Sequence, residues 1–215
     1  MNCDCIAVFY RWLEYAVFGR ALERRRMAFL TEASRARRVL ALGDGDGRAL
    51  AALVAAASSA RIEYVDSSAK MLELARARAG TDRVHYRRAD AREIDFAEFR
   101  EFGARSSKRL GDSGFDLIVT HFFLDCLDET ELQAVVDKTA RAAAPCARWI
   151  VSEFRPATIY ARLLIAVMYA FFQKATGLKT RRLADHHPLF LHHGFRLERV
   201  ERTWAGMLAS ELWVR

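Results

Sequence analysis

Cysteine and proline are scarce in this sequence, which contains four cysteines and three prolines among 215 residues. Four scattered cysteines are too few for the disulfide framework of a small secreted domain. The closest pair, Cys3 and Cys5, lacks the second pair or the nearby histidine that would complete a tetrahedral metal site. We therefore expect no bound metal. Few prolines and only eleven glycines exclude a collagen-like chain or one dominated by linkers.

The sequence also lacks a long apolar run. Its most apolar stretch, residues 159–172, is interrupted by Arg162, whereas a helix needs about 20 apolar residues to cross a bilayer. The first residues carry Asp4, Arg11 and Glu14 within an apolar stretch, which does not resemble a signal peptide. We expect a cytoplasmic protein without a transmembrane segment, although the 159–172 stretch leaves contact with a membrane surface open.

Acidic residues are fewer than basic ones, with 27 against 34, which gives a formal net charge of +7. Such a surplus is the usual starting point for a nucleic-acid hypothesis, but the basic residues form no single block. They are spread over the N-terminal segment, the residues before 38, the region around 84–88 and residues 174–182. The positive net charge is therefore a property of the outer surface as a whole. We expect a nucleic-acid partner to be unlikely.

Short apolar runs alternate with helical segments along the first two thirds of the chain. Strands are expected at 38–42, 62–65, 84–88, 115–120 and 149–152, and helices at 48–58, 69–79 and 129–144. Residues 6–30 have helical spacing and precede the first strand. This alternation is typical of β-α-β units, and it predicts an α/β fold with a doubly wound, mostly parallel sheet.

The pattern changes after residue 155. Residues 156–172 and 181–193 read as helices, and the runs 195–203 and 207–214 meet at Ala205-Gly206. A turn at that point predicts a β-hairpin, so the last strand is antiparallel to its neighbour. The sheet would then have seven strands, with N-terminal helices before it and a helical insert after the fifth strand.

The chemistry is carried by a glycine-rich turn after the first strand, where glycines occupy positions 43, 45 and 47. Dinucleotide-binding turns have the spacing G-x-G-x-x-G, but here Arg48 stands where the third glycine of that motif belongs. A pyrophosphate would also lie badly beside Asp44 and Asp46. Asp66 ends the second strand, and a carboxylate there can accept hydrogen bonds from both hydroxyls of a ribose. Asp90 follows the third strand.

At these residues the chain resembles the class I S-adenosylmethionine-dependent methyltransferases, from about residue 37 to residue 155. The resemblance implies that the glycine turn wraps the methionine part of the cofactor, that Asp66 holds the ribose and that Asp90-Ala91 contacts the adenine. The family usually has an acid two places before the first glycine, where this chain has Ala41. The expected contacts to S-adenosyl-L-methionine are Gly43, Asp44, Gly45, Gly47, Asp66, Ser67, Met71, Asp90, Ala91 and Thr120.

The resemblance also divides the chain, which we expect to be one methyltransferase domain over residues 1–215. Residues 1–35 would form an N-terminal helical lid and residues 36–155 the cofactor-binding core. Residues 156–193 would be a helical insert that also covers the acceptor, and residues 194–215 the hairpin. The segment 159–172 fits a buried core helix or a dimer helix equally well, so both a monomer and a homodimer remain open.

The methyl acceptor should lie near the ends of the fourth and fifth strands. His121 is the best candidate for a general base, and Asp125 could orient its imidazole. A purely structural His121 and a helix-capping Asp125 are equally compatible with the sequence. Aromatic residues nearby favour an aromatic or otherwise apolar small molecule. The expected acceptor contacts are Tyr10, Tyr15, Phe122, Phe123, Glu153, Arg155, Tyr160 and Tyr169.

Other methyltransferase classes fit less well. Residues 120–123 read Thr-His-Phe-Phe and lack the D/N/S-P-P-Y/F motif of amino-methylating DNA enzymes. Cys126 and Cys146 stand in contexts that do not suggest the nucleophile of a cytosine-C5 enzyme. The histidines at 186, 187, 192 and 193 read as the solvated end of a helix rather than a metal site. A catalytically silent binding module, allowed by Ala41, remains the main alternative to a small-molecule methyltransferase, ahead of a nucleic-acid enzyme.

Overall fold

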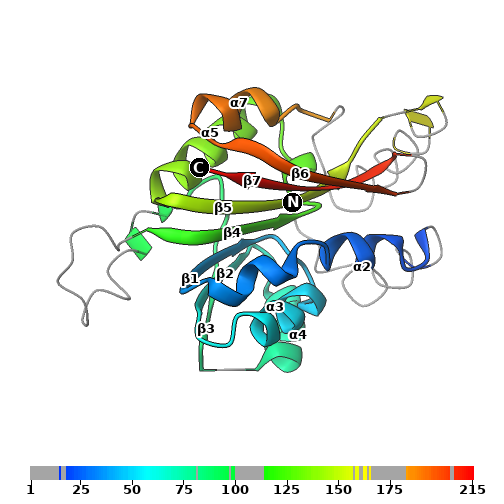
Figure 1. Ribbon diagram of the computed structural model, residues 1–215. Coiled ribbons are helices and arrows are strands. Elements are labelled where there is room, and N and C mark those ends of the chain that lie inside the picture. Colours follow the sequence, from blue (N-terminus) through cyan, green and yellow to red (C-terminus); the bar gives the residue numbers. More distant parts are fainter. Residues whose placement is uncertain are drawn as a thin grey trace.

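A seven-stranded sheet forms the centre of the computed structural model, which describes residues 15, 18–80, 82–96, 98–99, 114–156, 158–159, 162–163, 165, 183–203 and 206–215. The strand order is β3-β2-β1-β4-β5-β7-β6 (Figure 1). The first five strands pair in parallel, and β7 runs antiparallel to both β5 and β6. The expected sheet with its C-terminal antiparallel hairpin is confirmed. The strands are β1 (Arg38–Leu42), β2 (Arg61–Asp66), β3 (Val84–Arg88), β4 (Phe115–His121), β5 (Ala143–Phe154), β6 (Arg196–Thr203) and β7 (Leu208–Val214).

Helices cover both faces of this sheet. Alternate residues of each parallel strand point to opposite faces, and in β1 both sets are apolar and buried. Leu40 and Leu42 belong to the core packed under α5 and α7, while Val39 and Ala41 belong to the core packed under η1, α3 and α4. The helices are α2 (Ala21–Arg26), η1 (Leu30–Arg35), α3 (Arg48–Ala56), α4 (Ala69–Ala79), η3 (Leu124–Cys126), α5 (Glu129–Ala142) and α7 (His187–His192).

Side-chain caps begin two of the helices, and one of them was expected from the sequence. The Ser68 hydroxyl accepts a hydrogen bond from the Met71 N–H at the start of α4, as expected from its position. Asp128 and Glu131 form a capping box at the start of α5. Ser68 comes two residues after the end of β2, so its cap fixes where the chain leaves the carboxyl edge of the sheet there, and Asp128 begins α5 after the short helix η3.

Several boundaries differ from those expected. Strand β5 begins at Ala143, directly after α5, and is longer than the run 149–152 because its first residues pair beside Phe115. The helix expected over 181–193 is limited to α7 among the described residues, where Pro188 stands in the first turn. Most of residues 1–35 before α2 and most of the insert 156–193 lie outside the described residues. None of the helices in the described part of the chain combines the length and apolarity that crossing a bilayer requires.

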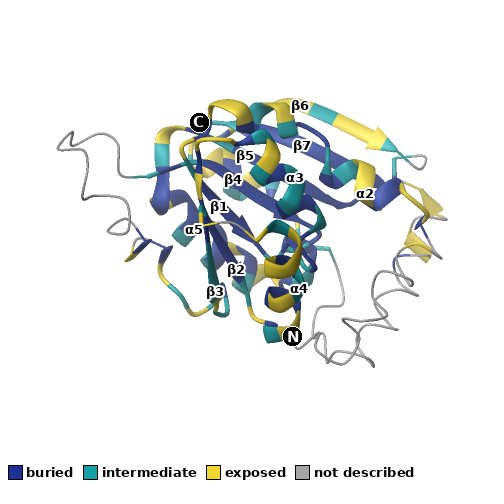
Figure 2. Ribbon diagram, turned by 90° about the horizontal axis from the view of Figure 1, so that it is seen from below, coloured by how far each residue is buried: buried dark blue, intermediate teal, exposed yellow. Residues whose placement is uncertain are grey.

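Strand β6 closes the sheet at one edge and is unlike the other strands. All of its residues are exposed or half-buried, on both of its faces, whereas β1 and β7 are buried except for one half-buried residue each (Figure 2). Its sequence, Arg-Leu-Glu-Arg-Val-Glu-Arg-Thr, is rich in charge of both signs. The apolar core therefore ends at β7.

Gly47 allows α3 and α4 to approach each other. Its backbone has φ of +82°, and a Cβ atom there would lie 2.4 Å from the Cα atom of Ala75 in α4. Substitution would force the two helices apart, because backbone atoms cannot yield as a side-chain end can.

We expect Gly47→Ala to lower the free energy of unfolding by about 2–4 kcal/mol, combining backbone strain with overpacking. Gly19→Ala is the matched control, since Gly19 has φ of +55° but no described atom within 4 Å of a Cβ. The control should lose only about 1–2 kcal/mol. Urea unfolding measures both, and equal losses would contradict the close-approach argument.

Candidate active site

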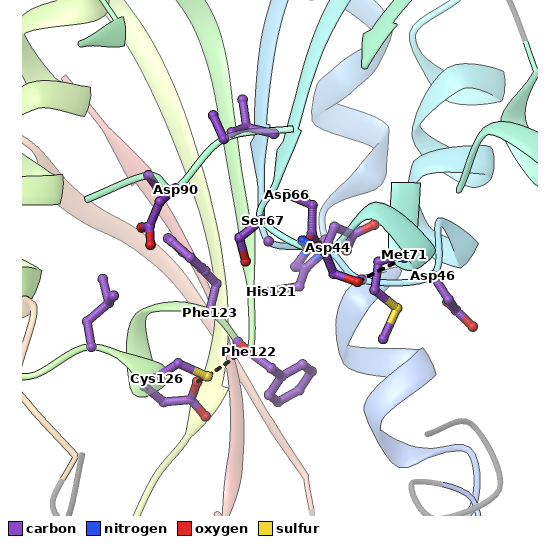
Figure 3. Close-up of a pocket in the computed structure, with 18 of the residues that line it drawn as sticks. Asp44, Asp46, Asp66, Ser67, Met71, Asp90, His121, Phe122, Phe123 and Cys126 are labelled. Atoms are coloured by element: carbon purple, nitrogen blue, oxygen red, sulfur yellow. Dashed lines mark hydrogen bonds and ion pairs between the residues drawn. The ribbon is translucent and has the colours of Figure 1, made fainter. Parts of the chain in front are cut away.

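A cavity opens at the carboxyl edge of the sheet, where the strand order reverses between β1 and β4. Ligands of doubly wound sheets bind at this position. Figure 3 shows Asp66 and Ser67 between Asp90 on one side and Asp44 on the other, with Phe122 and Cys126 below them. Most of the expected site residues line it: Gly43, Asp44, Gly45, Asp66, Ser67, Met71, Asp90, Ala91, His121, Phe122, Phe123 and Asp125.

The glycine turn is held in place by the neighbouring strand. The Gly43 N–H donates to the Val65 carbonyl at 2.9 Å, and the buried Tyr64 hydroxyl donates to the Gly45 carbonyl at 2.6 Å. Gly45 has φ of +73°, and a Cβ there would meet no described atom within 4 Å, although the residue lines the cavity. The turn thus presents open backbone to the cavity. Gly47 itself does not belong to the cavity wall, since it serves the contact with α4.

Asp46 is engaged by two arginines. Arg48 Nε lies 2.9 Å from its Oδ1 atom, and Arg78 forms an ion pair with the same carboxylate. Burial raises the pKa of Asp46, but the hydrogen bonds from Arg78 and Arg48 outweigh it, so the pKa lies below the ordinary value. Asp46 therefore stays ionised and locks the turn to α4.

Asp44 joins the glycine turn to the end of β4. Its Oδ2 atom accepts the Leu50 N–H in the first turn of α3, and its Oδ1 atom lies 2.8 Å from His121 Nδ1. Both side chains are buried. We expected Asp125 to orient the His121 imidazole, and this expectation is wrong: η3 directs Asp125 toward Cys126 and Glu153 instead.

The second nitrogen of His121 is left without a partner. His121 is only 2% exposed, and among the described residues its Nε2 atom has no hydrogen-bond partner although the residue lines the cavity. A buried polar atom of this kind is costly unless something bonds to it. With Nδ1–H donating to Asp44, Nε2 carries the lone pair of the ring.

The strand ends β2 and β3 supply two more carboxylates. Asp66 accepts the Ser68 N–H through Oδ1 at 2.8 Å, and a carboxylate has further lone pairs for a ligand. Both oxygens of Asp90 accept from the Arg92 guanidinium, which also pairs with Glu131. The Arg92 hydrogen bonds hold the pKa of Asp90 below its ordinary value despite partial burial.

Some expected site residues lie elsewhere. Thr120 is buried within the sheet and accepts a hydrogen bond from Trp149 Nε1, so it does not reach the cavity. Arg155 instead pairs with Glu211, and Tyr15 is exposed on another surface. Glu153 is buried behind the cavity wall. Tyr10, Tyr160 and Tyr169 lie outside the described residues.

Glu153 holds the loop that follows β4. Its Oε1 atom accepts the backbone N–H groups of Phe123 and Leu124, at 3.2 and 2.9 Å. Burial, and then the neighbouring Asp125 carboxylate, raise the pKa of Glu153 well above its ordinary value. Burial likewise raises the pKa of Asp125 to about 6. The buried carboxyl groups of Asp125 and Glu153 thus lie side by side, and in the folded chain this pair retains a proton to a higher pH than isolated acids would.

The sequence reasoning missed several cavity residues. Arg26 of α2 lies over the Phe122 ring at 5.1 Å, and Cys126, Phe154 and Arg92 also line the cavity. Phe122 has φ of +53°, an uncommon backbone conformation for a bulky residue that often marks functional sites. No spacing in the sequence links Arg26 to the strand ends, whereas Cys126 and Arg92 could have been found from their positions next to Asp125 and Asp90.

The C-terminal histidines correct another expectation. His186 is buried rather than solvated, and its Nε2 atom lies 2.9 Å from Glu211, which also contacts His187 and Arg155. The two histidines and Glu211 have ligand atoms within 4.8 Å of one another. The Arg155 guanidinium already compensates the carboxylate, so this cluster is explained as a buried ion-pair network.

Glu153→Gln should stabilise the fold at alkaline pH. A raised folded-state pKa means that the proton is bound more tightly when folded, so stability is greatest below the unfolded pKa and is lost as pH rises through the folded pKa. Glutamine removes this loss and keeps Oε1 as acceptor. We expect about 1–2 kcal/mol more stability near pH 8, shrinking toward pH 5.

Urea unfolding at both pH values measures this difference. Glu73→Gln, at an exposed residue of α4, is the control and should show no such pH-dependent gain. A Glu153→Gln protein destabilised equally at both pH values would contradict the protonated-acid argument.

Comparison with known proteins agrees with this geometry. Residues 39–146, just over half of the chain, match the family described as methyltransferase domain. The fold is similar to an O-methyltransferase family protein from Burkholderia thailandensis, with TM-score 0.65 and 15% identity over 97% of this chain and 59% of the other. It is also similar to the N-methyltransferase NodS from Bradyrhizobium japonicum WM9 in complex with S-adenosyl-l-homocysteine. That match has TM-score 0.63 and 14% identity, over 94% of this chain and 91% of the other.

A third similar structure is a 1,6-didemethyltoxoflavin-N1-methyltransferase from Burkholderia thailandensis, with TM-score 0.60 and 15% identity over 97% of this chain and 87% of the other. A comparison with curated protein sequences gives no match. The chain spans about three fifths of the first of these structures and most of the other two. At these identities, the likeness concerns the fold.

Proposed function

Because the chain belongs to the methyltransferase domain family, we propose that it transfers a methyl group from S-adenosyl-L-methionine to a small aromatic or otherwise apolar acceptor. The observation that carries the proposal is the convergence of the glycine turn, Asp66 and Asp90-Ala91 on one cavity, which Phe122 and Phe123 also line. Polar groups for a nucleoside and an apolar wall for an acceptor thus share one cavity.

The residues present fit this cofactor. The open backbone at Gly45 would receive the methionine part, Asp66 the ribose hydroxyls and Ala91, beside Asp90, the adenine. Since two arginines neutralise Asp46, Asp44 is the carboxylate we assign to the role of the family's acid that Ala41 replaces. When bound, the cofactor supplies an electrophilic methyl group on a sulfonium.

His121 is the candidate general base. Asp44 fixes the ring through Nδ1, which leaves the unpartnered Nε2 to accept a proton from the acceptor. The apolar wall of Phe122, Leu127 and Phe154 supports an apolar acceptor. A catalytically silent module would have no use for a pre-oriented imidazole.

Asp66→Ala tests the cofactor assignment. Loss of charge-assisted hydrogen bonds to the ribose should weaken binding of S-adenosylhomocysteine by about 1.5–3 kcal/mol, or roughly 10- to 150-fold. Calorimetric titration measures the affinity, with Glu73→Ala as the exposed control. Unchanged affinity in Asp66→Ala would reject the ribose role, and no binding by the wild-type chain would reject the function.

His121→Asn tests the catalytic assignment. The asparagine amide can replace Nδ1–H toward Asp44 but leaves nothing at Nε2, so turnover should fall by about 10²–10⁴-fold while cofactor affinity is kept. The assay is methyl transfer to whichever acceptor of a phenol, amine and carbon-acid panel the wild type uses. Turnover unchanged in His121→Asn would remove the residue from the mechanism, and cofactor binding without wild-type turnover would favour a silent module.

A further inference from the structure

Three arginines belong to the cavity lining among the described residues: Arg26, Arg48 and Arg92. Two of them are held by aspartates of the same cavity. Arg48 Nε lies 2.9 Å from Asp46, and the Arg92 guanidinium donates to both oxygens of Asp90. Arg26 has a different origin, because it is the last residue of α2, which precedes the whole sheet in the chain.

The Arg26 side chain is buried at the cavity wall. Arg26 is 5% exposed, and its guanidinium carbon lies 5.1 Å from the centre of the Phe122 ring. Burial raises the pKa of Asp125, another residue of the lining, and the positive charge of Arg26 opposes this rise. A guanidinium has five N–H donors in a planar fork, so one arginine can bind more than one carboxyl group. Arg92 does so in this cavity, where it pairs with both Asp90 and Glu131.

Two serine hydroxyls fix the end of α2 on the sheet. The Ser152 hydroxyl of β5 and the Ser210 hydroxyl of β7 each donate to the Arg25 carbonyl at 2.9 Å. The apolar face of α2 also packs in one cluster with Phe122. These contacts hold the backbone beside Arg26 before any ligand binds. A group that is held in this way binds a ligand at a small cost in conformational entropy.

Arg26 and Asp44 belong to the same end of the cavity. Asp44 Oδ1 lies 2.8 Å from His121 Nδ1, and Phe122, the next residue of the chain, lies under the Arg26 guanidinium. Figure 3 shows Phe122 below His121 and Asp44, with Asp90 on the other side of the cavity. A carboxylate and a guanidinium at one end match a ligand that carries an ammonium group and a carboxylate, because each buried charge needs a partner of opposite sign.

We propose that Arg26 is a cofactor-binding residue, which donates to the carboxylate at the methionine end of S-adenosyl-L-methionine while Asp44 faces the ammonium group. This inference rests on the proposed methyltransferase function, and it adds a residue that selects the cofactor by charge. Nucleosides without this carboxylate lose the contact with Arg26 and bind more weakly. Helix α2 is then part of the binding site.

S-adenosylhomocysteine and its decarboxylated analogue, in which hydrogen replaces the carboxylate, are matched probes. Both keep the adenosine, the thioether and the ammonium group, so they differ only at the group that Arg26 would bind. Calorimetric titration of the full chain near pH 7.5 should give an affinity for S-adenosylhomocysteine about 10- to 100-fold above that for the analogue. Equilibrium binding is measured, so the experiment needs no methyl acceptor.

Arg26→Met removes the charge and keeps much of the length of the side chain. It should weaken S-adenosylhomocysteine about 10- to 100-fold, to the level of the analogue, and leave the analogue nearly unchanged. Arg26→Lys keeps a positive charge without the planar fork, so the preference should shrink about threefold or more without being lost. Arg24→Met makes the same change as Arg26→Met at an exposed residue of α2 and should keep the full preference.

The analogue also separates a binding role from a folding defect. Equal weakening of both ligands in Arg26→Met and Arg26→Lys would make Arg26 a structural residue and overturn the proposal. Equal affinities in the wild type would overturn it, and so would a full preference in either Arg26 variant, since another donor would then hold the carboxylate. In each of these cases the wild type still binds S-adenosylhomocysteine, so the Arg26 assignment alone is wrong. If the wild type binds neither ligand, the proposed function is wrong.

Discussion

The buried carboxylate of Asp44 is the contact on which the site depends. One oxygen accepts from the first turn of α3, where backbone N–H groups have no partner within the helix, and the other accepts from the imidazole at the end of β4. Asp44 therefore ties the glycine turn to the strand across the switch point. Tyr64 and the Arg48–Asp46–Arg78 cluster hold the same turn from β2 and α4, so the cavity floor is fixed from four elements.

This arrangement concentrates polarity at one edge of the sheet. Strands β1, β4 and β7 are buried along almost their whole length, and three carboxylates that line the cavity, Asp44, Asp66 and Asp90, stand at or just after the ends of β1, β2 and β3. The net charge of +7 is compatible with an acidic cavity, because the acidic residues that line the cavity are a small part of the chain. Arginines pair with two of them, Asp46 and Asp90. The net charge of the whole chain therefore does not predict the sign of the charge at the cavity.

Local patterns in the sequence were sufficient for the fold. A run of apolar residues marked β1 at its observed bounds, the segment expected at 84–88 is β3, and Ser68 marked the start of α4. Contacts between distant residues were not accessible in the same way. His121 and Asp44 are 77 positions apart and meet only because β4 pairs with β1, whereas Asp125, the nearer acid in sequence, is turned away by η3. The same limit explains why Arg26 and the His186–Glu211 pair went unforeseen.

The exposed strand β6 also has a meaning for assembly. A second chain that added a strand to this edge would gain backbone hydrogen bonds but cover almost no apolar side chain, since most residues on both faces of β6 are polar. Dense charge on an edge strand is a known protection against such joining. The β6 edge of the sheet therefore disfavours a dimer in which two sheets join at this strand.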